Sequence, residues 1–316
     1  MPNYNGVWSL STQYQNAADW PRPPQIILQA GSIGNLGAAN QIQKFDVVTA
    51  GNSVDFGDLT TSRHDRAGFG SDTRAIFAGG TSNNVIEFVT FVTKGNATDF
   101  GDLSANNIIG GGASNNTRGL IGGKDGPADV IEYVTIANTG NSTDFGNLSV
   151  ARYYNGALAS ATRAVFGGGQ AAGGGHPVNN TMDYVTIANT GNATDFGDLS
   201  ATRRTNAGAS STTRGIFSGG YSNTGTAAIN IMEYITIGST GDVTDFGDLS
   251  VARGALGAGA GITRAMFAGG RASSGVSNVI DFVEIATTGN ATDFADLSVA
   301  SERGPCVGAT ATSVQA

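Results

Sequence analysis

The chain has 316 residues, of which only 13% are charged, and its formal net charge is −8. Nucleic-acid binding requires clustered lysines and arginines, and with three lysines and no basic run the chain is not expected to bind nucleic acid. No apolar stretch approaches the roughly 20 residues that span a bilayer, and the first 20 residues do not resemble a signal peptide. The single cysteine excludes an intrachain disulfide.

Residues 1–24 are predicted to form an N-terminal arm that lies outside the rest of the fold. They hold both tryptophans, Trp8 and Trp20, together with a short stripe of apolar side chains at helical spacing that includes Leu10 and Tyr14. Such an arm either packs against its own domain or docks into a neighbouring protein. Trp8, Leu10, Tyr14 and Trp20 are the residues predicted to dock, because exposed aromatic side chains are effective interface anchors.

The remainder, residues 25–316, contains six copies of a segment related to Thr-Asp-Phe-Gly-Asp-Leu. Their phenylalanines are spaced by 44, 45, 51, 50 and 48 residues, a period in the range of propeller blades with four strands each. The sequence therefore predicts an all-β fold, a six-bladed β-propeller. The six phenylalanines, which we expect to be buried between blades, are Phe56, Phe100, Phe145, Phe196, Phe246 and Phe294.

Within each unit the strands follow one order. A small-residue segment is followed by an apolar strand ending in paired glycines, then by an alternating strand such as VIEYVTI at 130–136. A Thr-Gly-Asn segment then precedes the Thr-Asp-Phe-Gly-Asp-Leu strand. We expect this segment to form a tight hairpin turn, because Gly and Asn tolerate the positive φ that such turns require. One arginine recurs at the start of the glycine-ended strand. We expect blade-to-blade hydrogen bonds from this set, Arg74, Arg118, Arg163, Arg214 and Arg264.

The count of strands predicts how the ring closes. The first unit begins directly with a glycine-type strand at 25–32 and lacks a small-residue strand before it, whereas a surplus small-residue strand follows the sixth unit at 303–312. Pairing the surplus strand with the first unit would complete six blades and leave neither end with an open sheet edge.

Few residues suit catalysis or metal binding. The two histidines, His64 and His176, fall in different units, and Cys306 sits in a small-residue strand without a histidine nearby. The repeated aspartates, such as Asp99 and Asp102, offer oxygen ligands for Ca²⁺, but their recurrence in nearly every unit favours a role in the turns. We therefore expect no enzyme activity, no metal and no cofactor.

The units differ most in two connections, the loop after the paired glycines and the linker after the Thr-Asp-Phe-Gly-Asp-Leu strand. In an up-and-down blade both emerge on the same face, and function generally resides in variable loops on a rigid scaffold. Arginines and aromatic residues are typical of recognition surfaces, although drift in exposed loops would give the same variation. The predicted partner-binding residues of this face are His64, Arg152, Tyr153, Tyr154, His176, Arg203, Arg204, Tyr221 and Arg271.

The order GALAS, RAVFGGG, MDYVTI and TDFGDL, followed by an arginine, resembles the kelch repeat over residues 25–316. That family has a small-residue inner strand, a Gly-Gly strand, a strand with Glu-x-Tyr and a strand with a large aromatic residue. Here Phe stands in place of the usual Trp, and Val-Thr in place of Asp-Pro. The resemblance implies a six-bladed kelch-like β-propeller.

The lysine-poor, Gly/Ala/Asn/Thr-rich composition and the segment GVWSLSTQYQNAADWP resemble structural proteins of tailed bacteriophages, especially marine ones. This resemblance implies a virion component of the tail, fibre or capsid surface, present in several copies and assembled in the host cytoplasm. The arm would contact other virion proteins, and the propeller would bind a host glycan or protein. The alternative is a bacterial kelch-like module that binds carbohydrate or protein. An enzymatic propeller is disfavoured, because the sialidase box and the copper ligands of oxidases are missing.

Overall fold

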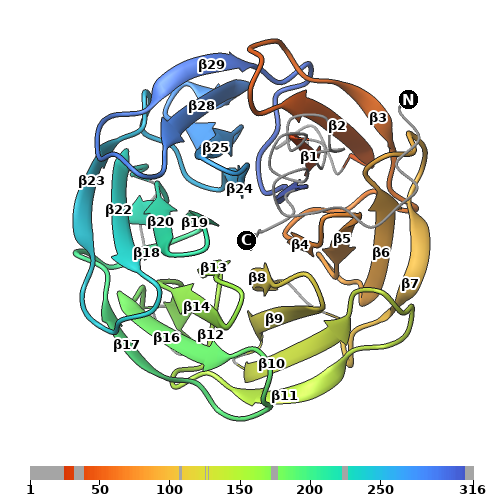
Figure 1. The fold of residues 1–316 in the computed structure, drawn as a ribbon, viewed down its shortest axis with the longest axis vertical. Helices are drawn as coiled ribbons and strands as arrows, with labels where there is room; N and C mark the ends of the chain where they lie inside the picture. The colour runs from red at the N-terminus through yellow and green to blue at the C-terminus, as the bar shows by residue number, and fades with distance from the viewer. Residues whose placement is uncertain are drawn as a thin grey trace, which may run out of the picture.

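The computed structural model describes residues 25–31, 39–106, 109–124, 126, 128–171, 177–222 and 227–309. In this part the chain forms an all-β, six-bladed β-propeller, with six four-stranded antiparallel sheets arranged around a central axis (Figure 1). The predicted N-terminal arm, with Trp8, Leu10, Tyr14 and Trp20, lies outside the described residues. No helix of the described ranges has the length and apolar character to cross a membrane.

The strands follow the predicted order in every blade, from the innermost to the outermost. Blade 1 consists of β30 (Cys306–Gly308), β1 (Ile26–Ala30), β2 (Gln41–Asp46) and β3 (Val54–Asp58). Blade 2 consists of β4 (Ala67–Gly70), β5 (Arg74–Ala78), β6 (Val85–Thr90) and β7 (Thr98–Asp102). Blade 3 consists of β8 (Ile109–Ser114), β9 (Arg118–Lys124), β10 (Ala128–Thr135) and β11 (Thr143–Asn147). Blade 4 consists of β13 (Gly156–Ala159), β14 (Arg163–Gly167), β16 (Thr181–Thr186) and β17 (Thr194–Asp198). Blade 5 consists of β19 (Ala207–Ser210), β20 (Arg214–Ser218), β22 (Ile231–Thr236) and β23 (Thr244–Asp248). Blade 6 consists of β24 (Gly257–Ala260), β25 (Arg264–Ala268), β28 (Val279–Glu284) and β29 (Thr292–Asp296). Three two-stranded pairs lie outside the blades: β12 (Arg152–Tyr153) with β15 (Gln170–Ala171), β18 (Arg203–Arg204) with β21 (Tyr221–Ser222), and β26 (Arg271–Ala272) with β27 (Gly275–Val276).

The predicted closure of the ring is confirmed. Strand β30 pairs antiparallel with β1, with Leu28 opposite Val307 and Gln29 opposite Cys306. The last strand of the chain thereby becomes the innermost strand of the first blade, at the centre of Figure 1. Ile27 and Leu28 can be fully buried because this pairing and the neighbouring blades cover them.

The core consists of apolar clusters that lie between neighbouring blades. The described residues form six such clusters, one at each blade junction. Each outer strand carries a β-bulge at its motif phenylalanine. In blades 2 to 6 this phenylalanine meets an aromatic side chain of the third strand edge-to-face, whereas blade 1 has Lys44 at that position. In blade 4, for example, Phe196 meets Tyr184 edge-to-face with ring centroids 5.9 Å apart.

Burial of the motif phenylalanines is confirmed for Phe56, Phe100, Phe145, Phe196 and Phe246, but wrong for Phe294, which is only half-buried. At the first five junctions a glycine follows the phenylalanine and accommodates the next hairpin; a Cβ on Gly101 would lie 2.3 Å from the carbonyl oxygen of Gly140. Blade 6 has Ala295 at this position. The hairpin glycine of the next blade donates to the carbonyl oxygen of the phenylalanine at the other five junctions, but among the described residues Gly51 makes no such bond to Phe294. The alanine side chain takes up the space this contact needs, and the cover of Phe294 is incomplete.

The repeated arginines act as predicted, as hydrogen-bonding links between blades. Arg214 donates from Nη1 to the carbonyl oxygens of Ile285 (3.0 Å) and Ala286 (2.8 Å) in the next blade. Its guanidinium also lies 4.5 Å from the ring centroid of Tyr234 in its own blade. Corresponding links to the next blade come from Arg74, Arg118, Arg163 and Arg264.

Candidate binding site at the mouth of the central channel

In blades 2, 4, 5 and 6, where both variable connections fall largely within the described residues, the two meet on one face of the propeller, as predicted. The linker strand β12 pairs with β15 from the loop after the paired glycines, and β18 pairs with β21 in the same way. In blade 2 the amide of Thr81 donates to the carbonyl oxygen of His64. We call this side the loop face. The central channel opens on it.

Five linker residues form a ring around the opening, which we call the mouth ring. They are linked through their backbones: Asp65 N donates to Arg303 O, Arg303 N to Ala255 O, Ala255 N to Thr205 O, and Thr205 N to Tyr154 O. The N···O distances lie between 2.7 and 3.1 Å. Each blade except blade 3 therefore contributes one residue to a continuous hydrogen-bonded arc.

All five residues of the mouth ring adopt the left-handed conformation, with φ between 52° and 58°. Non-glycine residues pay about 1–3 kcal/mol for such a conformation, and β-branched Thr205 is an especially uncommon case. Glycine would adopt it without cost. The chain has 48 glycines but uses none at these positions, so it retains side chains there at a cost in stability. Backbone strain of this kind is typical of functional sites.

The mouth ring encloses a pocket of about 120 Å³. Its walls are the innermost strands, whose small residues, such as Gly68, Gly112 and Ala157, leave the channel open. Asp65, Tyr154, Thr205 and Arg303 supply polar groups at the opening. The pocket is smaller than the roughly 300–1,000 Å³ of sites that enclose a whole drug-sized ligand. Its size suits the end of a longer molecule.

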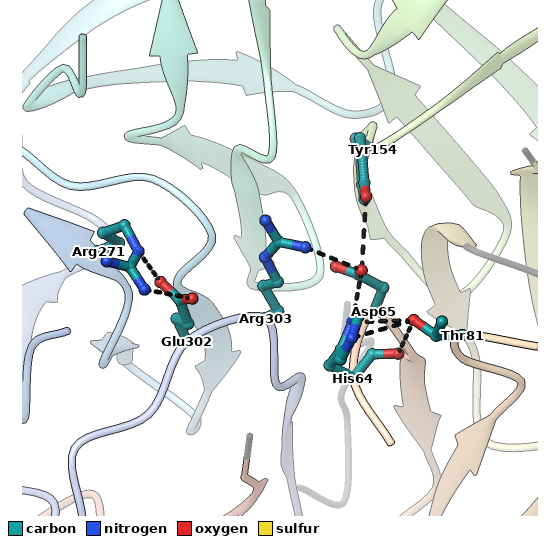
Figure 2. A network of polar contacts seen from close by, with 7 residues as sticks. All are labelled: His64, Asp65, Thr81, Tyr154, Arg271, Glu302 and Arg303. Carbon is teal, nitrogen blue, oxygen red and sulfur yellow. Dashed lines mark hydrogen bonds and ion pairs between the residues drawn. The ribbon is translucent and has the colours of Figure 1, made fainter. Parts of the chain in front are cut away.

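A polar network centred on Asp65 spans the part of the opening that the backbone arc leaves unlinked (Figure 2). Asp65 Oδ2 accepts from Tyr154 Oη at 3.4 Å and from Arg303 Nη1 at 3.3 Å, and it lies 2.8 Å from His64 Nδ1. Thr81 Oγ1 is 2.9 Å from the same imidazole nitrogen. Because the Asp65 side chain is only 4% exposed and that of Arg303 is 43% exposed, the carboxylate lies beneath and the guanidinium faces solvent.

A second ion pair lies beside this network. Arg271 Nε donates to Glu302 Oε2 at 2.5 Å, and Arg271 Nη2 to Oε1 at 2.9 Å. Glu302 is also 4% exposed, so the arginine again lies on the outside. Figure 2 shows Arg303 between this pair and the Asp65 network.

Arg204 is the one mouth arginine for which the described part of the chain offers no acceptor. Its guanidinium lies 5.8 Å from the ring centroid of Tyr221, and its buried Nε has no hydrogen-bond partner among the described residues. Tyr221 in turn packs on the backbone of Gly254, where a Cβ would lie 2.7 Å from the ring. The rim thus presents a positive group beside an aromatic face.

The two tyrosines of the rim remain protonated. Burial, and secondarily the charge of Asp65, raise the pKa of Tyr154 above its ordinary value. Burial and then Glu302 raise the pKa of Tyr221 in the same direction. Arg204 precedes Thr205 of the mouth ring, and Tyr221 packs on Gly254, which precedes Ala255 of the same ring, so both side chains lie next to the opening. The Tyr154 hydroxyl already donates its proton to Asp65, so toward a ligand it can only accept a hydrogen bond, whereas the Tyr221 hydroxyl can donate one.

The structure corrects two of the predicted partner-binding residues. Arg152 and Arg203 are fully buried, so they cannot touch a partner. Arg152 pairs with Asp183 at 2.9 Å, and Arg203 pairs with Glu233 of the third strand. Burial lowers the pKa of Arg203 to about 10, which still leaves it charged at neutral pH. Equivalent pairs join Arg63 to Glu87 and Arg253 to Asp281.

Of the other predicted residues that the structure describes, only Tyr154 lines the pocket. Four others lie next to mouth residues without lining the pocket: His64 contacts Asp65, Arg271 pairs with Glu302, Tyr221 packs on Gly254, and Arg204 lies against Tyr221. Tyr153 stacks near Tyr154 with ring centroids 4.6 Å apart and receives a hydrogen bond from Gln170. His176 lies outside the described residues.

Sequence reasoning missed Asp65, Glu302 and Arg303, although a signal for them exists. The residues five and six positions after the motif leucine differ in all six units, whereas the position just before them is arginine in four of the six. The fifth-position residues are His64, Ile108, Tyr153, Arg204, Gly254 and Glu302, and the sixth-position residues are Asp65, Ile109, Tyr154, Thr205, Ala255 and Arg303. Counting from the leucine would have found the mouth ring.

The sequence matches no protein-family model, and a search of curated proteins finds no match either. No group of three or more His, Cys, Asp or Glu side chains that could hold a metal ion occurs among the described residues. The site therefore has to be interpreted from its own chemistry.

Proposed function

We propose that the chain is a non-enzymatic binding protein that uses the mouth of its propeller to recognise a surface ligand. The observation that carries this proposal is the mouth ring. Five strained positions with the same backbone geometry hold five different side chains. If the mouth ring served only stability, glycine at these positions, or the same residue in every blade, would make the fold more stable. A ring of unlike side chains is suited to one asymmetric ligand that contacts several blades at once.

The finer proposal is a virion component of a tailed bacteriophage, with the propeller facing a host glycan or host protein and the N-terminal arm docked on other virion proteins. It is supported by the composition, by the arm sequence and by the kelch-like order of strands. A bacterial kelch-like module that binds carbohydrate or protein is the alternative. Both share the loop face as the binding surface and differ in where the chain resides.

Binding through the mouth can be tested on an array of bacterial surface polysaccharides and surface proteins. We expect the full chain to bind at least one of them, and a variant with Arg204→Ala, Tyr221→Ala and Arg303→Ala to lose at least tenfold in affinity while keeping a folded propeller. Arg163→Ala, on the opposite face, is the matched control. If the triple variant bound as tightly as the unaltered chain, the mouth would not be the binding surface. Release of a cleaved product from the bound ligand would contradict the non-enzymatic proposal.

The virion proposal has a separate test in the arm. Removing residues 1–24 should leave the propeller folded, because strands β1 to β30 by themselves complete all six four-stranded sheets. The same deletion should abolish incorporation into particles, and Trp8→Ala with Trp20→Ala should reproduce the defect. The readout is immunogold labelling of purified phage particles. Normal incorporation of the armless chain would contradict docking through the arm.

A further inference from the structure

The mouth carries an excess of positive charge in a chain that is otherwise negative. Arg303 lines the opening, and Arg204 and Arg271 lie next to it. Among the described residues, Asp65 pairs with Arg303 and Glu302 with Arg271, while no carboxylate pairs with Arg204. The net charge of the whole chain is −8. An opening with a positive electrostatic potential on an otherwise negative surface attracts anionic ligands.

The depth at which the charged groups lie strengthens the preference for anionic ligands. Both carboxylates are 4% exposed and lie beneath the arginines, so a ligand that approaches from solvent meets guanidinium groups first. Arg303 uses Nη1 for Asp65. Among the described residues, no acceptor takes a hydrogen bond from its other nitrogens or from the guanidinium of Arg204. Planar guanidinium groups pair with carboxylates through two parallel hydrogen bonds.

The neighbouring groups indicate what else the ligand contains. Tyr154 and Tyr221 supply rings and protonated hydroxyls, and Thr205 adds a further hydroxyl at the opening. The pocket is lined by glycines, alanines and polar side chains, with Leu256, Pro305 and Cys306 as its larger apolar residues, and it lacks the large apolar cavity that would take the aromatic or aliphatic anchor of a protein partner. Aromatic faces combined with convergent hydrogen-bond donors suit a compact ring with many hydroxyls. At about 120 Å³, the pocket suits one terminal unit.

We propose that the mouth binds the terminal acidic sugar of a glycan, with its carboxylate held by Arg204 and Arg303 and its ring against Tyr221. This deepens the proposed binding function and rests on it. Tyr154, whose hydroxyl donates to Asp65, offers its hydroxyl oxygen as an acceptor for a sugar hydroxyl. The mouth therefore selects for charge as well as for ring shape.

Two probes that differ only at the carboxylate test the proposal. We would titrate the full chain with methyl β-glucuronide and with methyl β-glucoside, measured by calorimetry and by saturation-transfer NMR. The expected result is binding of the glucuronide at least tenfold tighter than the glucoside, with affinity that falls as salt rises from 20 to 300 mM, because the charges are partly exposed. Equal affinities for the two probes would overturn the proposal.

Variants assign the effect to the mouth. Arg204→Met should weaken glucuronide binding at least tenfold and leave glucoside binding unchanged, whereas Lys94→Met, which removes an exposed charge from a hairpin, should change neither. Arg204→Lys keeps the charge without the planar fork, so it should fold and show an intermediate affinity even if Arg204→Met is unstable. Unchanged affinity in Arg204→Lys and Arg303→Lys would contradict the assigned contacts.

Competition separates the sugar from other anions. N-acetyl-glycylglycine carries a carboxylate on a peptide, and inorganic phosphate carries charge alone; neither should displace the glucuronide at equal concentration. Displacement by either would overturn the proposal in favour of a peptide or phosphate ligand. If the chain binds the array through its mouth but does not prefer the glucuronide, the proposed function stands and this inference fails.

Discussion

Individual side chains in this propeller have different roles in different blades, although they occupy equivalent positions. The motif phenylalanine is fully packed where the next residue is glycine and half-buried where it is Ala295. At the sixth linker position the same backbone geometry holds an acid in Asp65, a base in Arg303 and a phenol in Tyr154. A sixfold scaffold thereby presents a binding surface without sixfold symmetry.

The difference among the phenylalanines gives a measurable contrast. Phe196→Ala should lower the free energy of unfolding by about 3–5 kcal/mol, because it leaves a cavity in a packed blade junction. Phe294→Ala should cost less than half as much, because that ring is already partly exposed. Urea unfolding of both variants measures the difference. Equal losses would show that Phe294 is packed as tightly as the other five.

Cys306 provides a second prediction for a single residue. Burial raises the pKa of its thiol far above the ordinary value of about 9, so the folded protein should not react with a thiol reagent at pH 8, whereas the unfolded chain should react at once. Above about pH 9 the unfolded state releases this proton and the folded state keeps it, so stability should fall with rising pH. Cys306→Ala should remove that part of the pH dependence. Rapid labelling of the native protein would contradict the burial.

At the scale of strands and linkers, a buried ion pair fixes the variable linker to its own blade in four of the six blades. The linker arginine reaches the acid of the third strand in blades 2, 4, 5 and 6. Blade 1 replaces both partners together, with Gln43 for the acid and Ser301 for the arginine, and the neutral side chains form a hydrogen-bonded network through Gln29. The exchange of both partners avoids a buried charge without a counter-ion.

This pairing predicts a non-additive pair of substitutions. Arg203→Met should cost about 3–5 kcal/mol of stability, because it leaves Glu233 buried and uncompensated. Adding Glu233→Met should restore much of that loss, since a buried ion pair replaced by apolar side chains is often neutral. Thermal unfolding of the two single variants and the double variant provides the measurement. Additive losses would indicate that the two side chains do not interact.

For the molecule as a whole, stability depends on joining the two ends of the ring. Strand β30 comes from the end of the described chain, and its pairing with β1 brings together residues about 280 positions apart. Without it, β1 would become an open edge beside the channel, and the apolar junctions on both sides of blade 1 would lose their cover.

Truncation tests the closure directly. Deleting residues 303–316 should produce oligomers or aggregates and a lower melting temperature, because β30 is removed together with one residue of the mouth ring. Deleting only residues 310–316 keeps β30 and should leave the protein monomeric with unchanged melting. Size-exclusion chromatography and calorimetry distinguish the two. A monomeric, equally stable 303–316 deletion would show that the strand is dispensable.

The sequence by itself determined the repeat, the number of blades, the order of strands and the closure, because those features depend on periodic patterns that are local or can be counted. It also indicated the loop face, since connections of an up-and-down blade alternate between two sides. Only the tertiary structure decided which loop-face side chains are available. Arg203 and Arg204 are adjacent in the sequence, yet one is buried against Glu233 and the other lies at the rim. The turn of the linker at the left-handed residue and the contacts between blades far apart in the chain set that difference, and neither appears in the residue types alone.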